Sequence, residues 1–352
     1  MYKNESLSSL DVDTMKILVC GPSWVGDMVM AQSLFITLKK RYPAGIVDVL
    51  APSWSLPLLS RMPEVNQAIE LPIDHGELGL KKRFKIGRQL SENKYDWAII
   101  IPRSIKPALV PFFARIPIRT GYKGEARYIL INDPRKLDKT RLTMTVQRQV
   151  ALGCPKDAEQ PPNSIPPPVL RIDTTNRQRV VDDLNLDLNR PIVTFFPGAE
   201  YGPAKQWPLE YFRDLALKLV AAGYQVWILG GPQDKSYGKV IADGNSLHIY
   251  NLIGKTSLGD AIDIISLSKI TVTNDSGLMH VAAAVGVHVE VMYGATSPDY
   301  TPPLTDRKTT HYLALDCAPC FKRECPLGHL NCLKKITPAD VMKSIDNYIS
   351  SQ

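Results

Sequence analysis

Short apolar runs alternate with longer stretches of helical spacing along most of the chain. Residues 16–21, 46–51 and 97–101 have the composition of buried strands, while residues 28–40 and 81–90 have the spacing of helices. Alternation of this kind is typical of a parallel sheet covered by helices on both faces. The first part of the chain is therefore predicted to be a doubly wound α/β domain.

A proline-rich segment, residues 160–168 (QPPNSIPPP), interrupts this pattern near the middle of the chain and predicts a linker. The pattern then starts again. Strands are predicted at 192–196, 225–229 and 270–273, helices at 208–222, 261–267 and 278–285, and a terminal helix at 337–349. The predicted organisation is a tail (1–14), a first domain (15–168) that ends in the linker, and a second domain (169–352).

The junction between the predicted strand 270–273 and the following helix has the composition of an anion site. Asn274, Asp275 and Ser276 can cap a helix through their side-chain oxygens, and Gly277 lets a ligand approach the backbone. Unpaired N–H groups at a helix start bind phosphates in open α/β sheets. Ordinary capping explains such a turn equally well, but His280, three residues into the helix, favours a site.

Three other polar segments follow predicted strands, where the loops of a parallel sheet bind ligands. Residues 23–27 are predicted to be a loop in which Trp24 and Gly26 line the site and Asp27 could accept a proton from a hydroxyl group. Lys205, between two glycines after strand 192–196, suits a phosphate oxygen. Asp234 could bind ribose hydroxyls. Each of these residues also has an alternative without function: Asp27 could cap a helix, Lys205 could be a solvated surface residue, and Asp234 could belong to a simple turn.

Composition describes a globular protein with an excess of positive charge. The 352 residues are 44% hydrophobic and carry a formal net charge of +7, which favours an anionic partner. Neither a signal peptide nor an apolar run of spanning length is recognised, so a cytoplasmic location is expected. Residues 81–88 and 107–119 mix basic and apolar side chains and could touch an anionic membrane, although a solvated helix and a buried segment are the alternatives.

Four of the six cysteines lie within sixteen residues. Cys317, Cys320, Cys325 and Cys332 have the spacing C-x2-C-x4-C-x6-C, which matches no defined zinc or iron–sulfur pattern, so a metal, a redox role and reduced structural thiols all stay open. The D-x-D of Asp11 and Asp13 lies in the polar tail and is discounted as a metal site for transfer. No metal and no cofactor are therefore expected in the reaction.

Several long segments resemble the ADP-heptose:lipopolysaccharide heptosyltransferases, a family of GT-B glycosyltransferases, in particular those that add the second heptose. The segments are GPSWVGDMVMAQSL, RYPAGIVDVLAPSW, LLSRMPEVNQAIELP, FFPGAEYGPAKQWP, TNDSGLMHVAAA and YGATSPDYTPPL, and the similarity runs from about Met15 to near the C-terminus. The resemblance implies two Rossmann-like domains facing each other across a cleft, the first for the acceptor and the second for ADP-heptose. Closure of the two domains is then expected during transfer.

The resemblance also implies a reaction and roles for residues. L-glycero-D-manno-heptose would pass from ADP-heptose, with inversion and without a metal, to the first heptose of a lipid A-linked inner core. Asp27 in SWVGDM resembles the catalytic base and Lys205 in PAKQWP the lysine that binds the donor phosphates. The segment NDSGLMH, with Asp275, Ser276, Gly277 and His280, resembles the family's segment that grips the pyrophosphate and heptose of the donor. The expected location becomes peripheral, at the inner face of the inner membrane, with transient contact and no nucleic acid partner.

Three alternatives stay open at this point. The chain could catalyse another heptose transfer of the core, or it could be a nucleotide-sugar epimerase with the same two-domain architecture. It could also be a non-catalytic module that binds a nucleotide or a polyanion. Acceptor assays, product analysis and turnover separate these possibilities.

Overall fold

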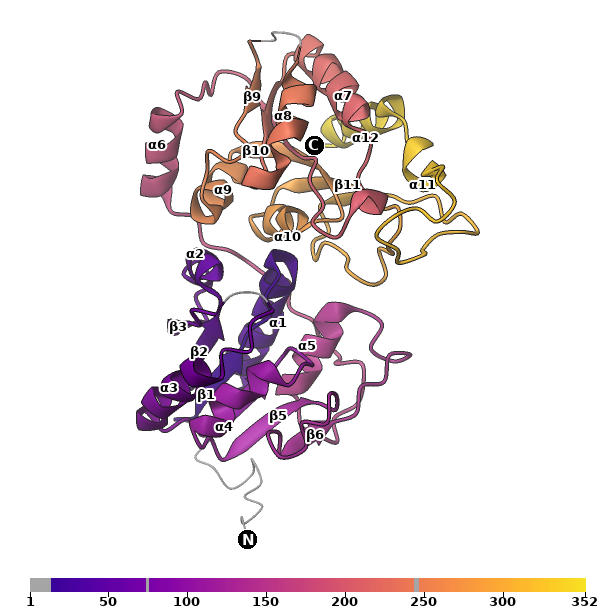
Figure 1. Cartoon of the computed structure of the whole chain (residues 1–352). Coiled ribbons are helices and arrows are strands. Elements are labelled where there is room, and N and C mark those ends of the chain that lie inside the picture. Colours follow the sequence, from indigo (N-terminus) through magenta and orange to yellow (C-terminus); the bar gives the residue numbers. More distant parts are fainter. Residues whose placement is uncertain (1–13, 74–75, 244–246) are drawn as a thin grey trace. The chain divides into compact units, whose positions relative to one another are not determined.

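The computed structural model describes residues 14–73, 76–243 and 247–352. It divides into two compact units, Met1–Pro168 and Val169–Gln352 (Figure 1). The discounted Asp11 and Asp13, like all of the predicted tail except Thr14, lie outside the described residues. Each unit is an α/β domain built on its own parallel sheet.

The first unit has a parallel sheet with the strand order β3-β2-β1-β4-β5-β6. The strands are β1 (Lys16–Cys20), β2 (Ile46–Ala51), β3 (Gln67–Glu70), β4 (Trp97–Ile100), β5 (Ile118–Tyr122) and β6 (Asp133–Arg135). The helices are α1 (Val25–Arg41), α2 (Leu56–Leu59), α3 (Leu80–Leu90), α4 (Leu109–Phe113) and α5 (Thr145–Gly153). Ile17, Leu18 and Val19 of β1 are fully buried, because a central parallel strand is covered on both faces and its sequence is therefore a continuous apolar run.

The first helix begins earlier than the sequence predicted. Trp24 is the extended N-cap residue and α1 starts at Val25, so Gly26 and Asp27 belong to the first helical turn. The prediction that they lie in a loop is wrong. A carboxylate is favourable at this position because the first N–H groups of a helix carry unpaired positive partial charge.

The second unit repeats the architecture with the strand order β12-β11-β10-β7-β8-β9. The strands are β7 (Ile192–Phe196), β8 (Gln225–Ile228), β9 (Ile249–Asn251), β10 (Ser268–Asn274), β11 (His288–Met292) and β12 (Lys308–His311). The helices are α6 (Thr174–Asp183), α7 (Leu209–Ala221), α8 (Lys235–Ala242), α9 (Leu258–Ile265), α10 (Gly277–Ala284), α11 (Asn331–Lys334) and α12 (Pro338–Ser350). The core on one side of this sheet gathers Phe195, Trp207 and Phe212 with apolar side chains of α7 and α12.

The two sheets share one topology. In each, the first strand of the unit lies beside the fourth, and the chain winds outward in both directions from that pair. Ligands of open α/β sheets bind outside the carboxyl ends of the strands at this reversal point. The reversal lies between β1 and β4 in the first unit and between β7 and β10 in the second. The segments that carry Asp27, Lys205 and Asp275 begin at the ends of β1, β7 and β10.

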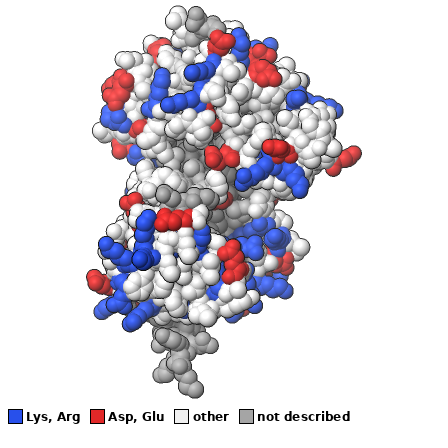
Figure 2. Space-filling model, viewed as in Figure 1, with Lys and Arg blue, Asp and Glu red and all other residues white. Residues whose placement is uncertain are grey.

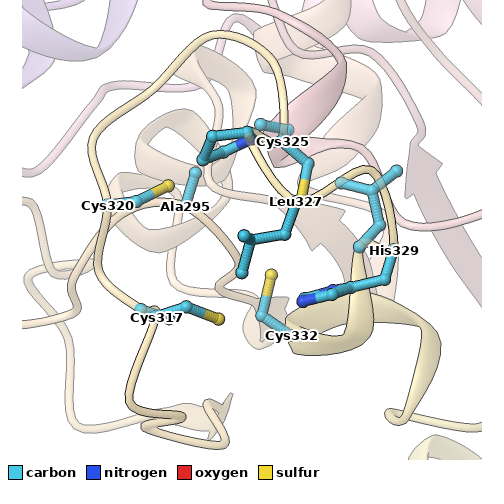
Figure 3. Close-up of a pocket in the computed structure, with 11 residues that line it drawn as sticks. Ala295, Cys317, Cys320, Cys325, Leu327, His329 and Cys332 are labelled. Carbon is cyan, nitrogen blue, oxygen red and sulfur yellow. The ribbon is translucent and has the colours of Figure 1, made fainter.

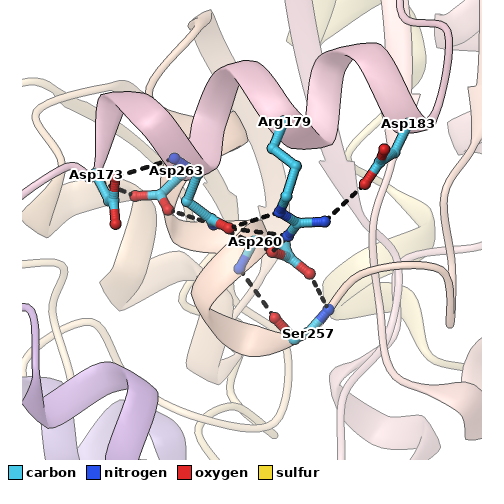
Figure 4. Close-up of polar contacts among 7 residues, drawn as sticks. Asp173, Arg179, Asp183, Ser257, Asp260 and Asp263 are labelled. Atoms are coloured by element: carbon cyan, nitrogen blue, oxygen red, sulfur yellow. Dashed lines mark hydrogen bonds and ion pairs between the residues drawn. The ribbon is translucent and has the colours of Figure 1, made fainter.

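A polar network fastens α6, the first helix of the second unit, to α9 (Figure 4). Asn176 Nδ2 donates to Asp263 Oδ2 at 2.7 Å, and the backbone N–H of Asp173 donates to Asp263 Oδ1 at 2.9 Å. Asp263 is fully buried, so these bonds satisfy a carboxylate that would be costly to bury alone. The more exposed Arg179 adds a 2.7 Å ion pair to Asp260, which contributes less.

The charged surface is mixed rather than uniformly basic. Figure 2 shows Lys and Arg side chains over both units with Asp and Glu side chains among them. Among the described residues, no helix combines the length and the apolar character that crossing a bilayer requires. The segment 107–119 is largely interior, since Ala108, Val110 and Ala114 belong to the core of the first unit.

Candidate active site

Lys205 and Asp275 meet at the reversal point of the second sheet. Lys205 lies in a 3-10 turn (Pro203–Lys205) after β7, and Asp275 directly follows β10. Lys205 Nζ lies 2.5 Å from Asp275 Oδ2, with side chains 14% and 5% exposed. Thr296 Oγ1 donates to the same oxygen at 2.6 Å. The sequence therefore predicted Lys205 and Asp275 of this polar cluster but not Thr296. Thr296 lies after β11 in YGATSPDYT, a segment that carries part of the family resemblance.

Asn274 fixes the loop that carries Lys205. Its Nδ2 donates to Pro197 O at 2.7 Å, and its Oδ1 accepts the Trp207 N–H at 2.9 Å. Asn274 is fully buried and so bridges both ends of the segment 197–207. It was predicted as a capping residue, but its amide instead determines where Lys205 stands.

The segment from Ser276 to His280 forms the start of α10. Ser276 is the extended N-cap residue without a side-chain capping bond, and Gly277 is the first helical residue. The N–H groups of this turn therefore face the carboxyl end of β10 without a side-chain acceptor at the N-cap, which suits an anion. Side-chain capping by Ser276, an alternative for this turn, is not what the structure has.

His280 is buried beside this cluster, at 5% exposure. Burial lowers the pKa of its imidazole to about 4; the Asp275 carboxylate opposes this shift, and the Lys205 ammonium adds to it. The ring is therefore neutral at pH 7 and can donate or accept a hydrogen bond without adding charge.

Asp234 lies against the loops that follow β7 and β8 of the second sheet. Its Oδ2 accepts the Gly231 N–H at 3.1 Å, and a Cβ placed on Gly198 would lie only 2.5 Å from the same oxygen. Burial raises the pKa of this carboxyl, and the Gly231 N–H opposes the shift. Asp234 is 9% exposed, and its carboxylate stabilises the turn that contains it. This is the arrangement that the alternative of a simple turn describes, rather than one specific to binding ribose.

In the first unit, Trp24, Gly26 and Asp27 follow β1. Trp24 is 49% exposed, an unusual exposure for so large a ring at the entrance of a helix. Gln149 of α5 donates to the backbone oxygen of Asp27 at 3.1 Å. This bond holds the backbone of the first turn of α1. It does not involve the Asp27 carboxylate, whose orientation depends on other contacts of that side chain.

Two buried arginines near the end of β1 were not recognised from the sequence. Arg83 is 5% exposed and Arg127 2% exposed, and Arg83 Nη1 and Arg127 Nε are buried without a hydrogen-bond partner. Both guanidinium groups lower the pKa of Cys20, which burial raises to about 12. The basic stretch 81–88 was interpreted as surface, whereas Arg83 points into the domain.

Among the described residues, no group of three or more His, Cys, Asp or Glu side chains is arranged to hold a metal ion. At the carboxyl edge of the second sheet, Lys205 and Asp275 bring their charges together beside the N-terminus of α10.

Two units of matching topology, each with polar loops at its reversal point, define a two-domain α/β protein with the GT-B type of fold. The model of glycosyltransferase family 9 (heptosyltransferase) matches residues 83–331. The chain belongs to this family and is a glycosyltransferase.

Curated relatives and a solved structure agree with this assignment. The chain is 44% identical over 346 residues to lipopolysaccharide heptosyltransferase 2 of Salmonella typhimurium, covering 96% of this chain and 99% of the relative. It is 46% identical over 305 residues to lipooligosaccharide heptosyltransferase 2 of Haemophilus influenzae, covering 84% and 88%. The structure of E. coli ADP-heptose lps heptosyltransferase II superposes with a TM-score of 0.85 at 42% identity, covering 95% and 98%. The predicted resemblance and fold class are confirmed.

Proposed function

We propose that this chain transfers heptose from ADP-heptose to a lipopolysaccharide inner core that already carries one heptose. The donor and the acceptor class are those named for its 44%-identical relative and for the superposed structure. The observation that carries the donor part is the cluster of Lys205, Asp275 and the α10 N-terminus at the reversal point of the second sheet. A lysine and a helix N-terminus complement a diphosphate.

In the proposed reaction, the Asp27 carboxylate takes the proton from an acceptor hydroxyl. The hydroxyl oxygen forms a bond to the anomeric carbon on the face opposite the diphosphate, and the bond to the diphosphate oxygen breaks as ADP leaves with its electron pair. Lys205 and the N–H groups at the start of α10 stabilise the charge on the leaving diphosphate. Gly277 allows the backbone to approach it, while Ser276 and His280 contact the donor as neutral groups.

Both units have to contribute to this reaction, since Asp27 belongs to the first and the donor residues to the second. We assign the acceptor to the first unit and the donor to the second. Asp234 is the weakest of the proposed donor residues because its carboxylate is already engaged by the Gly231 N–H.

The buried Arg83 supports an anionic acceptor, whereas Arg127 already donates to the carbonyl oxygens of Pro102, Ser104 and Tyr122. A buried guanidinium group with an unpartnered nitrogen is costly unless an anion or another acceptor completes its bonds. We infer that a phosphate or carboxylate of the inner core approaches Arg83. Arg83→Lys is then expected to raise the KM for acceptor while leaving ADP affinity unchanged, and an unchanged acceptor KM contradicts this inference.

Contact with a membrane surface is a further part of the proposal. On α3, Leu80 and Phe84 are 48% and 51% exposed, beside the exposed Lys81 and Lys85. An apolar ridge flanked by lysines suits an anionic lipid surface. Phe84→Asp should reduce co-sedimentation with vesicles containing anionic lipid, and equal sedimentation of both proteins contradicts the contact.

The test of the function is transfer from ADP-heptose, in the presence of EDTA, to lipid-linked acceptors with one heptose or none. Transfer only to the acceptor with one heptose is expected. Transfer to the acceptor without heptose moves the assignment to the first step, and ADP binding without transfer to either favours a binding module. A sugar isomerised without acceptor favours an epimerase.

The role of Asp27 needs a separate measurement. Asp27→Asn should abolish transfer and retain ADP binding, because the proposed nucleotide site lies in the other unit. Asp157→Asn, at an exposed position of the same unit, is the matched control. Transfer by Asp27→Asn at the control rate excludes Asp27 as the base.

A further inference from the structure

The four clustered cysteines line one small apolar pocket of the second unit (Figure 3). We call residues 317–332 the cysteine loop. Its four thiols are all free of disulfide bonds; three are partly exposed, and Cys332 is buried. They face a common space together with His329 and Leu327. The reaction proposed above uses none of them.

The cysteine loop is hydrogen-bonded to the segment that carries Lys205. Arg323 O accepts the Ala204 N–H at 3.0 Å, and Phe321 O accepts the Tyr201 hydroxyl at 2.6 Å. Ala204 precedes Lys205 directly and also lines the cysteine pocket. A displacement of the cysteine loop therefore reaches the lysine through two hydrogen bonds.

The fit between the two segments is tight. Gly202 has φ +145°, and a Cβ at this position would lie 2.7 Å from Arg323 O. The Phe321 N–H donates to Ala295 O at 2.7 Å, so the loop also holds the residue before Thr296. The side chains of Lys205 and Thr296 both contact Asp275 Oδ2. Each of these residues follows a residue that is hydrogen-bonded to the cysteine loop.

Cys325 has the surroundings of a reactive thiolate. It begins a turn through Gly328, whose φ is +69°, and the turn directs backbone N–H groups at the cysteine sulfur. The Leu330 N–H contributes most to lowering the pKa of Cys325, burial opposes the shift, and the N–H groups of Leu327, Gly328 and His329 add smaller contributions to the lowering. Thiolates stabilised in this way and accessible to solvent are the cysteines that oxidants attack.

Cys332 is the opposite case in the same pocket. Burial raises the pKa of its thiol, the neighbouring Cys317, Cys325 and Cys320 raise it further, and its own backbone N–H opposes the shift. The sulfur atoms are therefore close enough to influence one another. The pocket therefore brings Cys325 together with three further thiols that can react with its oxidised product.

We propose that Cys325 is an oxidant-sensitive modification site, and that a disulfide from Cys325 to another cysteine of this pocket displaces the Lys205 segment and weakens donor binding. The last step rests on the proposed function, in which Lys205 binds the donor diphosphate. The oxidant is a peroxide. Oxidation of Cys325 within the pocket thus lowers transfer without touching the reacting atoms.

The chemistry has two balanced steps. The Cys325 thiolate attacks one peroxide oxygen, the S–O bond forms, the O–O bond breaks, and the leaving oxygen takes a proton to become water. A second pocket thiol then attacks the sulfenic sulfur, the S–S bond forms, and hydroxide leaves with the thiol proton as a second water. The cysteine pair loses two electrons, and the peroxide gains them.

The experiment treats the full-length protein with hydrogen peroxide, maps disulfides by peptide mass spectrometry and measures ADP binding by calorimetry before and after a dithiol reductant. We expect a disulfide that contains Cys325 and an ADP Kd that rises at least about fivefold and returns on reduction. Cys325→Ser should bind ADP like the wild type and lose the response. Cys154→Ser, a cysteine of the first unit, is the matched control and should respond like the wild type.

Three results overturn the proposal: no disulfide at Cys325, a disulfide with unchanged ADP affinity, or a stoichiometric metal ion that shields the thiols in the purified protein. The disulfide map is made on wild-type protein and so does not depend on the folding of Cys325→Ser. ADP affinity of reduced Lys205→Gln tests the proposed function separately: wild-type affinity there refutes the role of Lys205, while the disulfide map still reports on Cys325.

Discussion

Lys205 Nζ lies 2.5 Å from Asp275 Oδ2, although the two residues are 70 positions apart in the sequence. The carboxylate orients the ammonium group at the carboxyl edge of the sheet. Thr296 donates to the same carboxylate oxygen, so Asp275 keeps a second partner when the ammonium turns towards another anion. In the proposed reaction, Lys205 is shared between Asp275 and the donor diphosphate.

Replacing Lys205 by Gln should weaken ADP binding roughly 10- to 100-fold, the worth of a hydrogen bond to a charged group. The effect has two sources: the cation is lost, and the Asp275 carboxylate then faces the diphosphate with less compensation. Calorimetry measures the loss, with Lys218→Gln at an exposed position of α7 as the control. Equal affinities of the two variants would remove Lys205 from the donor site.

The neutral state of His280 leads to a second prediction. Because burial lowers its folded pKa to about 4, the imidazole should titrate far below pH 6.5 in an NMR titration, identified by the signal lost in His280→Gln. The unfolded chain binds this proton more readily, so His280 removes stability as pH falls from about 6.5 towards 4. A midpoint near 6.5 would show that the ring is not buried as described.

The sequence predicted the strands at the middle of each sheet, but it missed the interior strands β5 and β11 as well as the edge strands. β1, β4, β7 and β10 lie inside the sheets, where burial on both faces requires an apolar run that is visible in the sequence. Lys308–His311, which forms β12, is an edge strand with a polar composition and gave no such signal. Edge strands are defined by their neighbours rather than by their own residues.

The candidate site shows a similar limit. Asp275 and Lys205 were found because a family string and a strand end coincide there. Local sequence cannot reveal that Asn274 bonds to Trp207, 67 residues away. The burial of Arg83 was also hidden, since its neighbours on α3 are exposed lysines. Side chains whose role depends on distant partners need the folded structure.

Asn274 should be sensitive to truncation. Asn274→Ala leaves the Pro197 carbonyl and the Trp207 N–H without their side-chain partner in a buried place, which should lower the free energy of unfolding by about 2–4 kcal/mol. It should also weaken ADP binding, because the segment 197–207 carries Lys205. Urea unfolding and calorimetry measure the two effects, with the exposed Asn189→Ala as the control. A loss of stability with unchanged ADP affinity would mean that Asn274 supports the fold alone.

The buried carboxylate of Glu290 links β11, β12 and α12 of the second unit. Glu290 of β11 is fully buried. It pairs with His288 Nε2 at 2.9 Å and His311 Nε2 at 2.7 Å, and it accepts the Ser344 hydroxyl at 2.9 Å. Tyr348 stacks on His288 at 3.7 Å between ring centroids. Helix α12 is therefore attached to the sheet through this group.

Glu290 should make the second unit sensitive to acid. Burial alone would raise its pKa, but the bonds from His288, His311 and Ser344 outweigh burial and lower it to about 2. Since the pKa of Glu290 in the unfolded chain lies above its pKa in the folded protein, the stability from Glu290 is complete above about pH 4.5 and is lost as pH falls towards 2.

Glu290→Gln should lower the free energy of unfolding at pH 7 by about 3 kcal/mol and flatten the decline of that free energy between pH 4.5 and 2. Urea unfolding over this pH range measures both, and the exposed Glu210→Gln should retain the wild-type profile. If Glu290→Gln loses stability with acid as steeply as the control, the acid sensitivity lies in other groups.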